Sequence, residues 1–218
     1  HLVIVTDPDT PLDNSSRKSG YKVVNADPLV GGRFSALSAF GLVPAALLGI
    51  DISLLLDDAE LAGKTFNQVN SPAIEVASLL FLQTKQIFNI CDSKSNVPGL
   101  SDWIEQLIAE STGKNGVGRL PVLINSIDQI KGGVSIGLSK GEFDLIIEAS
   151  LGEHFIFWEW VTALLCYLLK VDPFNQPNVT EAKERSSTIL NSIITGDFKS
   201  EIPVAENEAY SIYSTQSI

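Results

Sequence analysis

The 218-residue sequence contains no methionine, only two histidines and only two cysteines. Because His1 and His154 are the only histidines, a histidine-rich zinc site is not expected. Cys91 and Cys166 lie far apart in apolar runs, which favours buried, reduced thiols over a disulfide framework. Since no methionine is present to start the chain, we expect a fragment of a longer polypeptide.

Positive charge is also scarce, and the net charge is −11. Such a chain lacks the basic surface that nucleic acid or an anionic membrane would need, so neither partner is expected. The longest apolar run, residues 155–169, is shorter than the ~20 residues of a membrane span and contains Glu159. No signal peptide is visible. A single anionic metabolite needs only local donors and stays a possible ligand.

Apolar segments of two kinds alternate along the chain. Continuous β-branched or apolar runs predict strands at 2–6, 21–25, 86–91, 121–124 and 143–147. Helical spacing predicts helices at 36–48, 51–61, 72–83, 102–110, 152–170 and 178–190. Ser71, Ser101 and Asn178 are the expected N-caps, and Gly49 and Gly63 the expected helix ends. This alternation indicates an α/β fold with mostly parallel sheets, in two units at 1–68 and 69–218, the first truncated at its N-terminus.

The segment Gly31-Gly32-Arg33 precedes the first apolar helix. Two glycines let a backbone approach a ligand, because no Cβ stands in the way. A cation at the start of a helix opposes the helix dipole, so a sequence that places Arg33 there has a use for it. The competing interpretation, at about even weight, is a simple turn with a solvated arginine.

Three further residues carry weaker signals. Glu110 falls in the last turn of its predicted helix, where the dipole disfavours a negative charge, an environment that suits a general base. On spacing alone, Glu110 and Lys183 are more commonly solvated surface residues, and His154 is more commonly structural. The glycine-rich loop at 113–118 lacks the spacing of a phosphate-binding loop.

Three separated stretches resemble the phosphoglucose isomerase (glucose-6-phosphate isomerase) family. Gly31-Gly32-Arg33-Phe34-Ser35 is similar to its glycine-glycine-arginine-aromatic-serine signature. Residues 109–114 resemble the Glu-Ser-x-Gly-Lys segment of its shorter bacterial members. Residues 172–183 resemble its Asn-x-Phe-Asp-Gln-x-Gly-Val-Glu-x-x-Lys segment. Residues 36–44 and 178–183 look most like bacterial proteins in which a transaldolase is fused ahead of the isomerase.

The resemblance implies two flavodoxin-like αβα sugar-isomerase (SIS) units in a cytoplasmic protein that is usually a homodimer. It implies interconversion of glucose 6-phosphate and fructose 6-phosphate through a cis-enediol(ate), without cofactor or metal. Glu110 then matches the base that moves the proton between C2 and C1. Arg33, beside the substrate-binding Gly31 and Gly32, matches the guanidinium that stabilises the enediolate. Lys183 matches the lysine that helps ring opening and positioning.

Two features depart from the family pattern. The catalytic histidine that usually follows the glutamate is missing, since His154 does not align with it. The family's first glycine-rich strand turn and its Ser/Thr phosphate-binding loop would precede residue 1, so we expect this chain alone to bind sugar phosphate poorly. Two alternatives therefore stay open: a non-catalytic sugar-phosphate-binding SIS module, and an isomerase that acts on mannose 6-phosphate.

Overall fold

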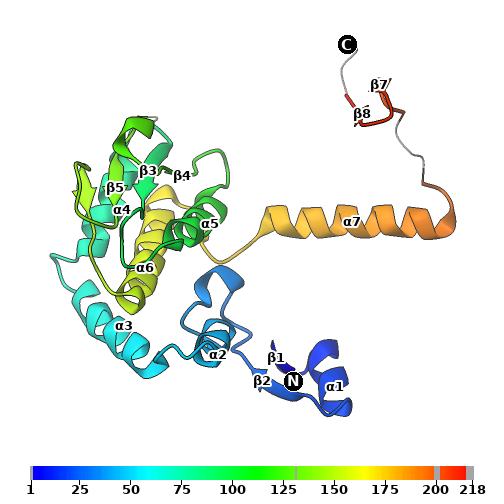
Figure 1. Cartoon of the computed structure of the whole chain (residues 1–218), viewed down its shortest axis with the longest axis horizontal. Coiled ribbons are helices and arrows are strands. Elements are labelled where there is room, and N and C mark those ends of the chain that lie inside the picture. Colours follow the sequence, from blue (N-terminus) through cyan, green and yellow to red (C-terminus); the bar gives the residue numbers. More distant parts are fainter. Residues whose placement is uncertain (1, 131, 199–201, 215–218) are drawn as a thin grey trace. The chain divides into compact units, whose positions relative to one another are not determined.

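The computed structural model describes residues 2–130, 132–198 and 202–214 (Figure 1). The chain divides into two compact units, His1–Asn175 and Gln176–Ile218. The predicted assignment of 1–68 and 69–218 to two SIS units stays a prediction. No helix within the described residues is long and apolar enough to cross a membrane. Both cysteines are free and buried, as their apolar surroundings predict.

The first unit begins with two parallel strands joined by a helix. Strands β1 (Val3–Thr6) and β2 (Lys22–Asn25) confirm the first two predicted strands. The apolar pattern does not predict the connecting helix α1 (Pro11–Lys18), because Leu12 is its only aliphatic residue. Its stability comes instead from a Thr10 N-cap that accepts a hydrogen bond from the Asp13 backbone, and from the Asp13–Arg17 ion pair at 2.7 Å.

A second sheet of four parallel strands forms the centre of this unit. Its spatial order is β4 (Leu120–Leu123), β3 (Ile87–Cys91), β5 (Ser135–Gly137) and β6 (Leu145–Ile146). Counted along the chain, this order is 2-1-3-4, the flavodoxin-like doubly wound arrangement. The α/β prediction with parallel strands is therefore confirmed, although β5 was not predicted and the strand expected at 143–147 is only two residues long.

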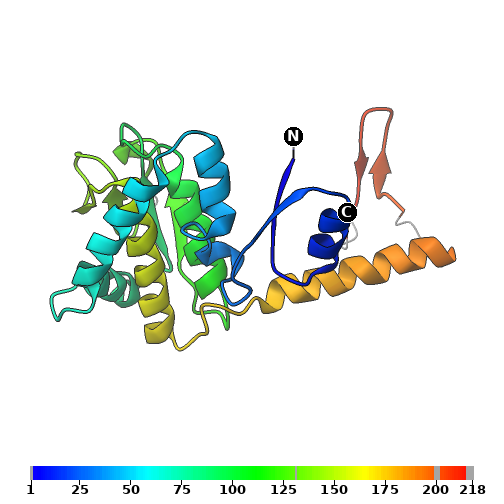
Figure 2. The ribbon, with the colours of Figure 1, turned by 90° about the horizontal axis from the view of Figure 1, so that it is seen from below.

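Helix α6 (Leu151–Leu169) supports the other helices of this unit. A capping box between Ser150 and Glu153 fixes its start. Figure 2 shows α3 (Ile52–Phe66) beside α6, and α4 (Pro72–Leu82) and α5 (Leu100–Thr112) also pack on it. A Cβ on Gly152 would lie 2.0 Å from the Leu55 carbonyl oxygen, so glycine permits the close approach of α3 and α6.

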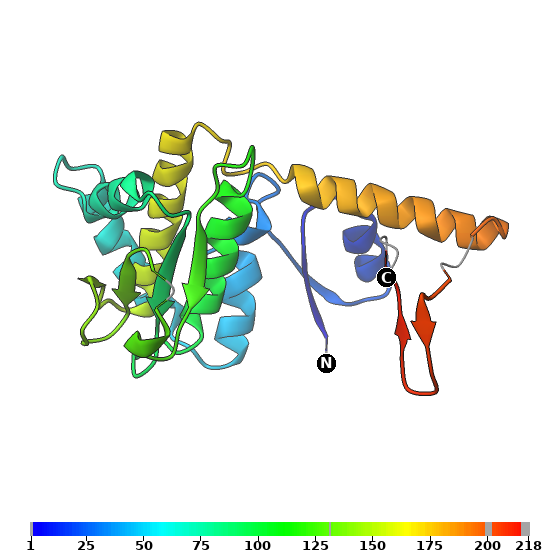
Figure 3. The same ribbon diagram turned by 90° about the horizontal axis from the view of Figure 1, so that it is seen from above.

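The hydrophobic core lies between these helices and the four-stranded sheet. Trp158, Val161 and Leu165 of α6 are fully buried in it, together with Ile104 and Ile108 of α5. Figure 3 shows β3 and β4 side by side, with α5 next to β4. Burial of this apolar surface stabilises the position of α5.

The helices between residues 32 and 66 start and end differently from the prediction. Arg33 does not open the apolar helix: it lies in a separate 3-10 turn, η1 (Gly32–Phe34). Helix α2 (Ala39–Leu47) begins later, because the Ser38 hydroxyl accepts a hydrogen bond from the Phe40 backbone and caps it. Helix α3 continues through Gly63 to Phe66, whose buried ring contacts the rings of Phe157 and Trp160.

The predicted N-cap position is confirmed at α4 and corrected at α5 and α7. Ser71 occupies the N-cap position of α4, but its hydroxyl makes no capping hydrogen bond. Helix α5 starts at Leu100 after Gly99, whose φ of 85° favours glycine, and Ser101 lies inside the helix. Asn178 also lies inside its helix, because Pro177 takes the first helical position.

The second unit contains α7 (Pro177–Thr195) and a short antiparallel pair, β7 (Ala205–Glu206) and β8 (Ser211–Ile212). Helix α7 is longer than predicted and ends at Gly196, whose φ is 78°. The last predicted element, an extended or partly disordered tail after Thr195, contains this hairpin; residues 199–201 and 215–218 lie outside the described residues.

Candidate functional site

Arg33 is held at the C-terminal end of α5 from three directions. Its Nε donates a hydrogen bond to the Ser111 hydroxyl at 3.0 Å. Its Nη2 donates to the backbone carbonyls of Pro173 at 2.8 Å and of Asn175 at 3.4 Å. Its Nη1 lies 3.5 Å from Glu110 Oε2. The side chain is buried, so this guanidinium is a fixed charge and not the solvated arginine of the simpler interpretation.

Glu110 has both carboxylate oxygens oriented while its side chain stays 40% exposed. Oε2 faces Arg33, and Oε1 accepts a hydrogen bond from Gln106 Nε2 at 3.1 Å, one helical turn earlier. Glu110 lies in the last turn of α5, as predicted. The structure therefore brings together two of the predicted site residues, from positions 77 apart in the sequence.

The segment from Asp172 to Asn175 closes one side of this pair. The Phe34 and Phe174 rings are in contact, with centroids 5.1 Å apart. Lys114 Nζ donates a hydrogen bond to the Asp172 carbonyl. Burial lowers the pKa of Lys114, and the positive charge of Arg33 nearby adds to this effect. Sequence reasoning missed the role of Lys114; a lysine just after a helix C-terminus is the local signal for it.

The Arg33–Glu110 pair lies at the amino edge of the sheet. Strands β3 and β4 are parallel, so the connecting helix α5 must run back and end where the strands begin. Open α/β sheets bind ligands by default at the opposite, carboxyl edge. There, Asp92 follows β3, and its Oδ2 accepts hydrogen bonds from the Gly99 and Ser101 backbone amides and from the Ser101 hydroxyl. The protein's own carboxylate thus occupies this helix N-terminus.

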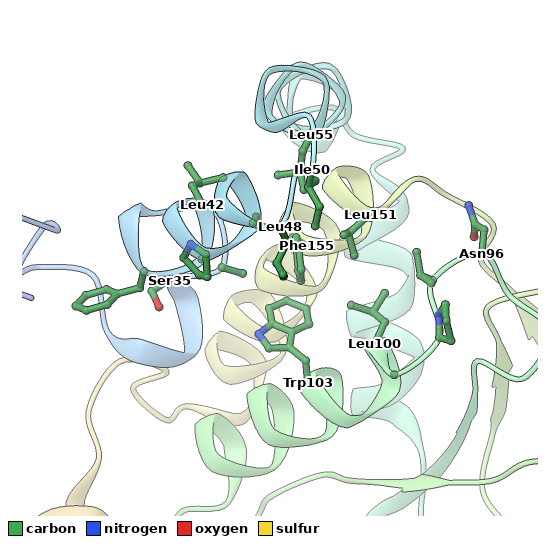
Figure 4. Close-up of a pocket in the computed structure, with 18 of the residues that line it drawn as sticks. Ser35, Leu42, Leu48, Ile50, Leu55, Asn96, Leu100, Trp103, Leu151 and Phe155 are labelled. Atoms are coloured by element: carbon green, nitrogen blue, oxygen red, sulfur yellow. The ribbon is translucent and has the colours of Figure 1, made fainter. Parts of the chain in front are cut away.

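A cavity of about 700 Å³ lies between α2, α5 and the start of α6, where Leu48, Trp103 and Phe155 surround it (Figure 4). Ser35 lies at one end of it and Asn96 at the other, and Gly32 is also part of the lining. None of the described residues that line it is ionisable. A sugar phosphate needs charged or hydrogen-bonding partners, so the chemistry of this lining does not match one, and the arginine–glutamate pair is the better candidate site.

The backbone at Gly31 and Gly32 does not itself require glycine. Neither residue has a positive φ, and a Cβ on either would meet no atom of the described chain within 4 Å. Lys183 is exposed on α7, in the second unit. The roles of all three residues stay predictions.

Helix α6 carries a buried histidine and a half-buried glutamate. His154 is fully buried, both ring nitrogens lack a hydrogen-bond partner in the described chain, and burial lowers its pKa to about 4. Burial raises the pKa of Glu159 to about 8. A neutral histidine buried in this way is consistent with the structural interpretation of His154. Among the described residues no group of three or more His, Cys, Asp or Glu is placed to hold a metal ion.

The 2-1-3-4 parallel sheet and the arginine–glutamate pair define a doubly wound α/β protein with a candidate acid–base site at a sheet edge. No family model matches the chain. The chain is 29% identical to glucose-6-phosphate isomerase from Mycoplasmopsis pulmonis, over 87% of this chain and 61% of that protein. It is 32% identical to glucose-6-phosphate isomerase from Carboxydothermus hydrogenoformans, over 67% of this chain and 35% of that protein. The chain is therefore a homologue of glucose-6-phosphate isomerases, and it spans less than two thirds of the length of these relatives.

Two solved structures have a similar fold. A hypothetical protein from Thermus thermophilus superposes with a TM-score of 0.76 at 23% identity, over 87% of this chain and 63% of the other. A glucose-6-phosphate isomerase from Chlamydia trachomatis superposes with a TM-score of 0.68 at 16% identity, over 91% of this chain and 53% of the other. At these identities the likeness concerns the fold.

Proposed function

We propose that the protein interconverts glucose 6-phosphate and fructose 6-phosphate, a cytoplasmic reaction of glycolysis and gluconeogenesis. The observation that supports this most is the 3.5 Å contact between Arg33 Nη1 and Glu110 Oε2, made by the two segments that resemble the isomerase motifs. The printed names of the relatives point to the same reaction.

In this proposal Glu110 is the base that moves a proton between C2 and C1 of the open-chain sugar. Its 40% exposed side chain can reach a ligand, and its orientation by Gln106 and Arg33 reduces the entropy cost of aligning it. The buried guanidinium of Arg33 stabilises the negative charge that develops on the enediolate oxygens. Gly31 and Gly32 leave space for the sugar phosphate, and Lys183 assists ring opening. No cofactor or metal is required.

The domain organisation, the oligomeric state and the fusion to a transaldolase are part of the same proposal. Residues 1–68 and 69–218 would belong to two SIS units of a homodimeric enzyme, with a transaldolase domain fused to the isomerase. The resemblance of residues 36–44 and 178–183 supports the fusion. Light scattering on the intact gene product measures the oligomeric state: a monomeric mass would contradict the dimer.

The test is an isomerase assay on the gene product that contains this chain. We expect fructose 6-phosphate to form from glucose 6-phosphate, and mannose 6-phosphate in a parallel reaction shows whether that sugar is also used. The absence of the family's histidine favours a second candidate, a non-catalytic binding module. Saturable binding of glucose 6-phosphate without turnover would select the module and overturn the enzyme.

A further inference from the structure

The hydrogen bonds of Arg33 divide its guanidinium into a held edge, bonded to Ser111 and to backbone carbonyls, and an edge that faces Glu110. The group has five N–H bonds. The single Nε–H is directed to Ser111, and the two on Nη2 correspond to the carbonyls of Pro173 and Asn175. The two remaining N–H bonds belong to Nη1, which faces the Glu110 carboxylate. Nη1 is therefore the edge that can reach a reacting atom.

Two residues outside the proposed catalytic set fix the held edge. Ser111 is fully buried, and its hydroxyl is the acceptor for Arg33 Nε. Lys114 is 9% exposed, and its ammonium group donates to the carbonyl of Asp172. Asp172 directly precedes the segment whose carbonyls hold Nη2, so Lys114 and Arg33 bind neighbouring carbonyls of the same stretch of backbone.

We propose that Ser111 and Lys114 are positioning residues, which orient Arg33 so that only its Nη1 edge faces the reacting atoms beside Glu110. The inference rests on the proposed function for its catalytic consequence, but the orientation itself is a property of the folded chain. A guanidinium that is already oriented stabilises developing charge without reorganisation during the reaction. Loss of either anchor leaves Arg33 in place but less firmly oriented, because its bonds to Pro173, Asn175 and Glu110 remain.

The first experiment is kinetic and uses Ser111→Ala and Lys114→Met in the intact gene product. For each, kcat should fall about 10- to 100-fold while KM changes less than about threefold, since the lost interaction acts in the transition state. Ser135→Ala is the matched control for Ser111→Ala: it removes a buried serine hydroxyl that donates to Asp144 at 2.7 Å. Lys140→Met, at an exposed lysine, is the control for Lys114→Met. Both controls should keep wild-type kcat.

The second experiment does not depend on activity. In protein labelled with ¹⁵N-arginine, the exchange rate of the Arg33 Nε proton with water reports its hydrogen bond to Ser111. We expect this rate to rise at least about tenfold in Ser111→Ala and Lys114→Met and to stay unchanged in both controls. Arg119 is the internal reference, because its buried guanidinium donates to the carbonyls of Leu80 and Phe81.

The two experiments distinguish failure of the proposed function from failure of the positioning role of Ser111 and Lys114. An inactive wild type overturns the proposed function, while the exchange rate of the Arg33 Nε proton still decides the inference. An unchanged Arg33 rate in both variants overturns the inference, even in an active enzyme. Faster exchange at Arg33 and Arg119 together would show general loosening of the fold, and would also overturn a specific positioning role. Restored kcat in Ser111→Thr, which keeps the hydroxyl, supports it.

Discussion

The two ends of helix α5 differ in how completely the chain satisfies its own polar groups. At the N-terminal end the Asp92 carboxylate accepts three hydrogen bonds from Gly99 and Ser101. At the C-terminal end Arg33 keeps one edge directed at a partly exposed Glu110. A helix N-terminus at the carboxyl edge of a parallel sheet is the usual place for an anion. Here that place is filled internally, and the end that carries an oriented, partly exposed ion pair is the one suited to chemistry.

The largest effect should come from Glu110→Gln, which removes the proposed base at the C-terminal end of α5. Loss of a general base costs about 10²- to 10⁴-fold in rate. We expect kcat for fructose 6-phosphate formation to fall by that amount in the intact gene product, with little change in thermal stability. Glu105→Gln, the same substitution on the same helix, is the control and should keep wild-type activity. A Glu110→Gln enzyme with wild-type kcat would remove Glu110 from the mechanism.

At the N-terminal end of α5, Asp92→Ala should have the opposite effect: lower stability with an unchanged kcat. It leaves two backbone amides and a hydroxyl without their acceptor, which costs about 1–3 kcal/mol in the free energy of unfolding. Denaturant unfolding measures the loss, and kcat of the folded protein should be unchanged. Asp102→Ala, an exposed carboxylate in the first turn of α5, should cost only about 0.3–1 kcal/mol. A tenfold fall in kcat on Asp92→Ala would place part of the active site at the N-terminal end of α5.

Most of the sheet could be predicted from sequence, because β-branched and apolar runs such as 86–91 leave little alternative to a buried strand. Helix α1 could not be predicted from apolar spacing, because capping and the Asp13–Arg17 pair stabilise it. The position of Arg33 in a 3-10 turn depends on serine hydroxyls: Ser35 donates to Gly32 O and Ser38 to Ser35 O. The Arg33–Glu110 contact joins residues distant in sequence, and only the family resemblance indicated it before the structure.

Helix α6 packs on α5, and its Glu159 should make stability depend on pH. Burial raises the pKa of Glu159 from 4.5 to about 8, so the native state holds a proton that the unfolded state has released. Stability therefore falls as the pH rises through this window, by about 1 kcal/mol between pH 7 and pH 8. Burial lowers the pKa of His154 to about 4, so its effect on stability has the opposite sign. That effect falls mainly below the unfolded pKa of 6.5, and therefore below the interval from pH 7 to pH 8.

Denaturant unfolding of wild type and of Glu159→Gln at pH 7 and pH 8 measures the effect. The variant carries no titrating group at this position, so its free energy of unfolding should not show the fall. Equal slopes in the two proteins would mean that Glu159 is ionised in the native state. In that case α6, which packs on α5, would carry a charge in addition to the Arg33–Glu110 pair.

The smallest expected effect is that of Gly32→Ala, and it tests whether open space beside Arg33 is there for a ligand. A Cβ on Gly32 meets nothing of the described chain within 4 Å, so stability should change by less than about 0.5 kcal/mol. If the substrate lies against Gly32, the added methyl group of Gly32→Ala should raise KM for glucose 6-phosphate about three- to tenfold, with kcat nearly unchanged. Gly41→Ala is the contrasting control, because its Cβ would lie 2.0 Å from the Ala36 carbonyl oxygen and should reduce stability. An unchanged KM in Gly32→Ala would leave Arg33 and Glu110 as the whole of the proposed site at this end of α5.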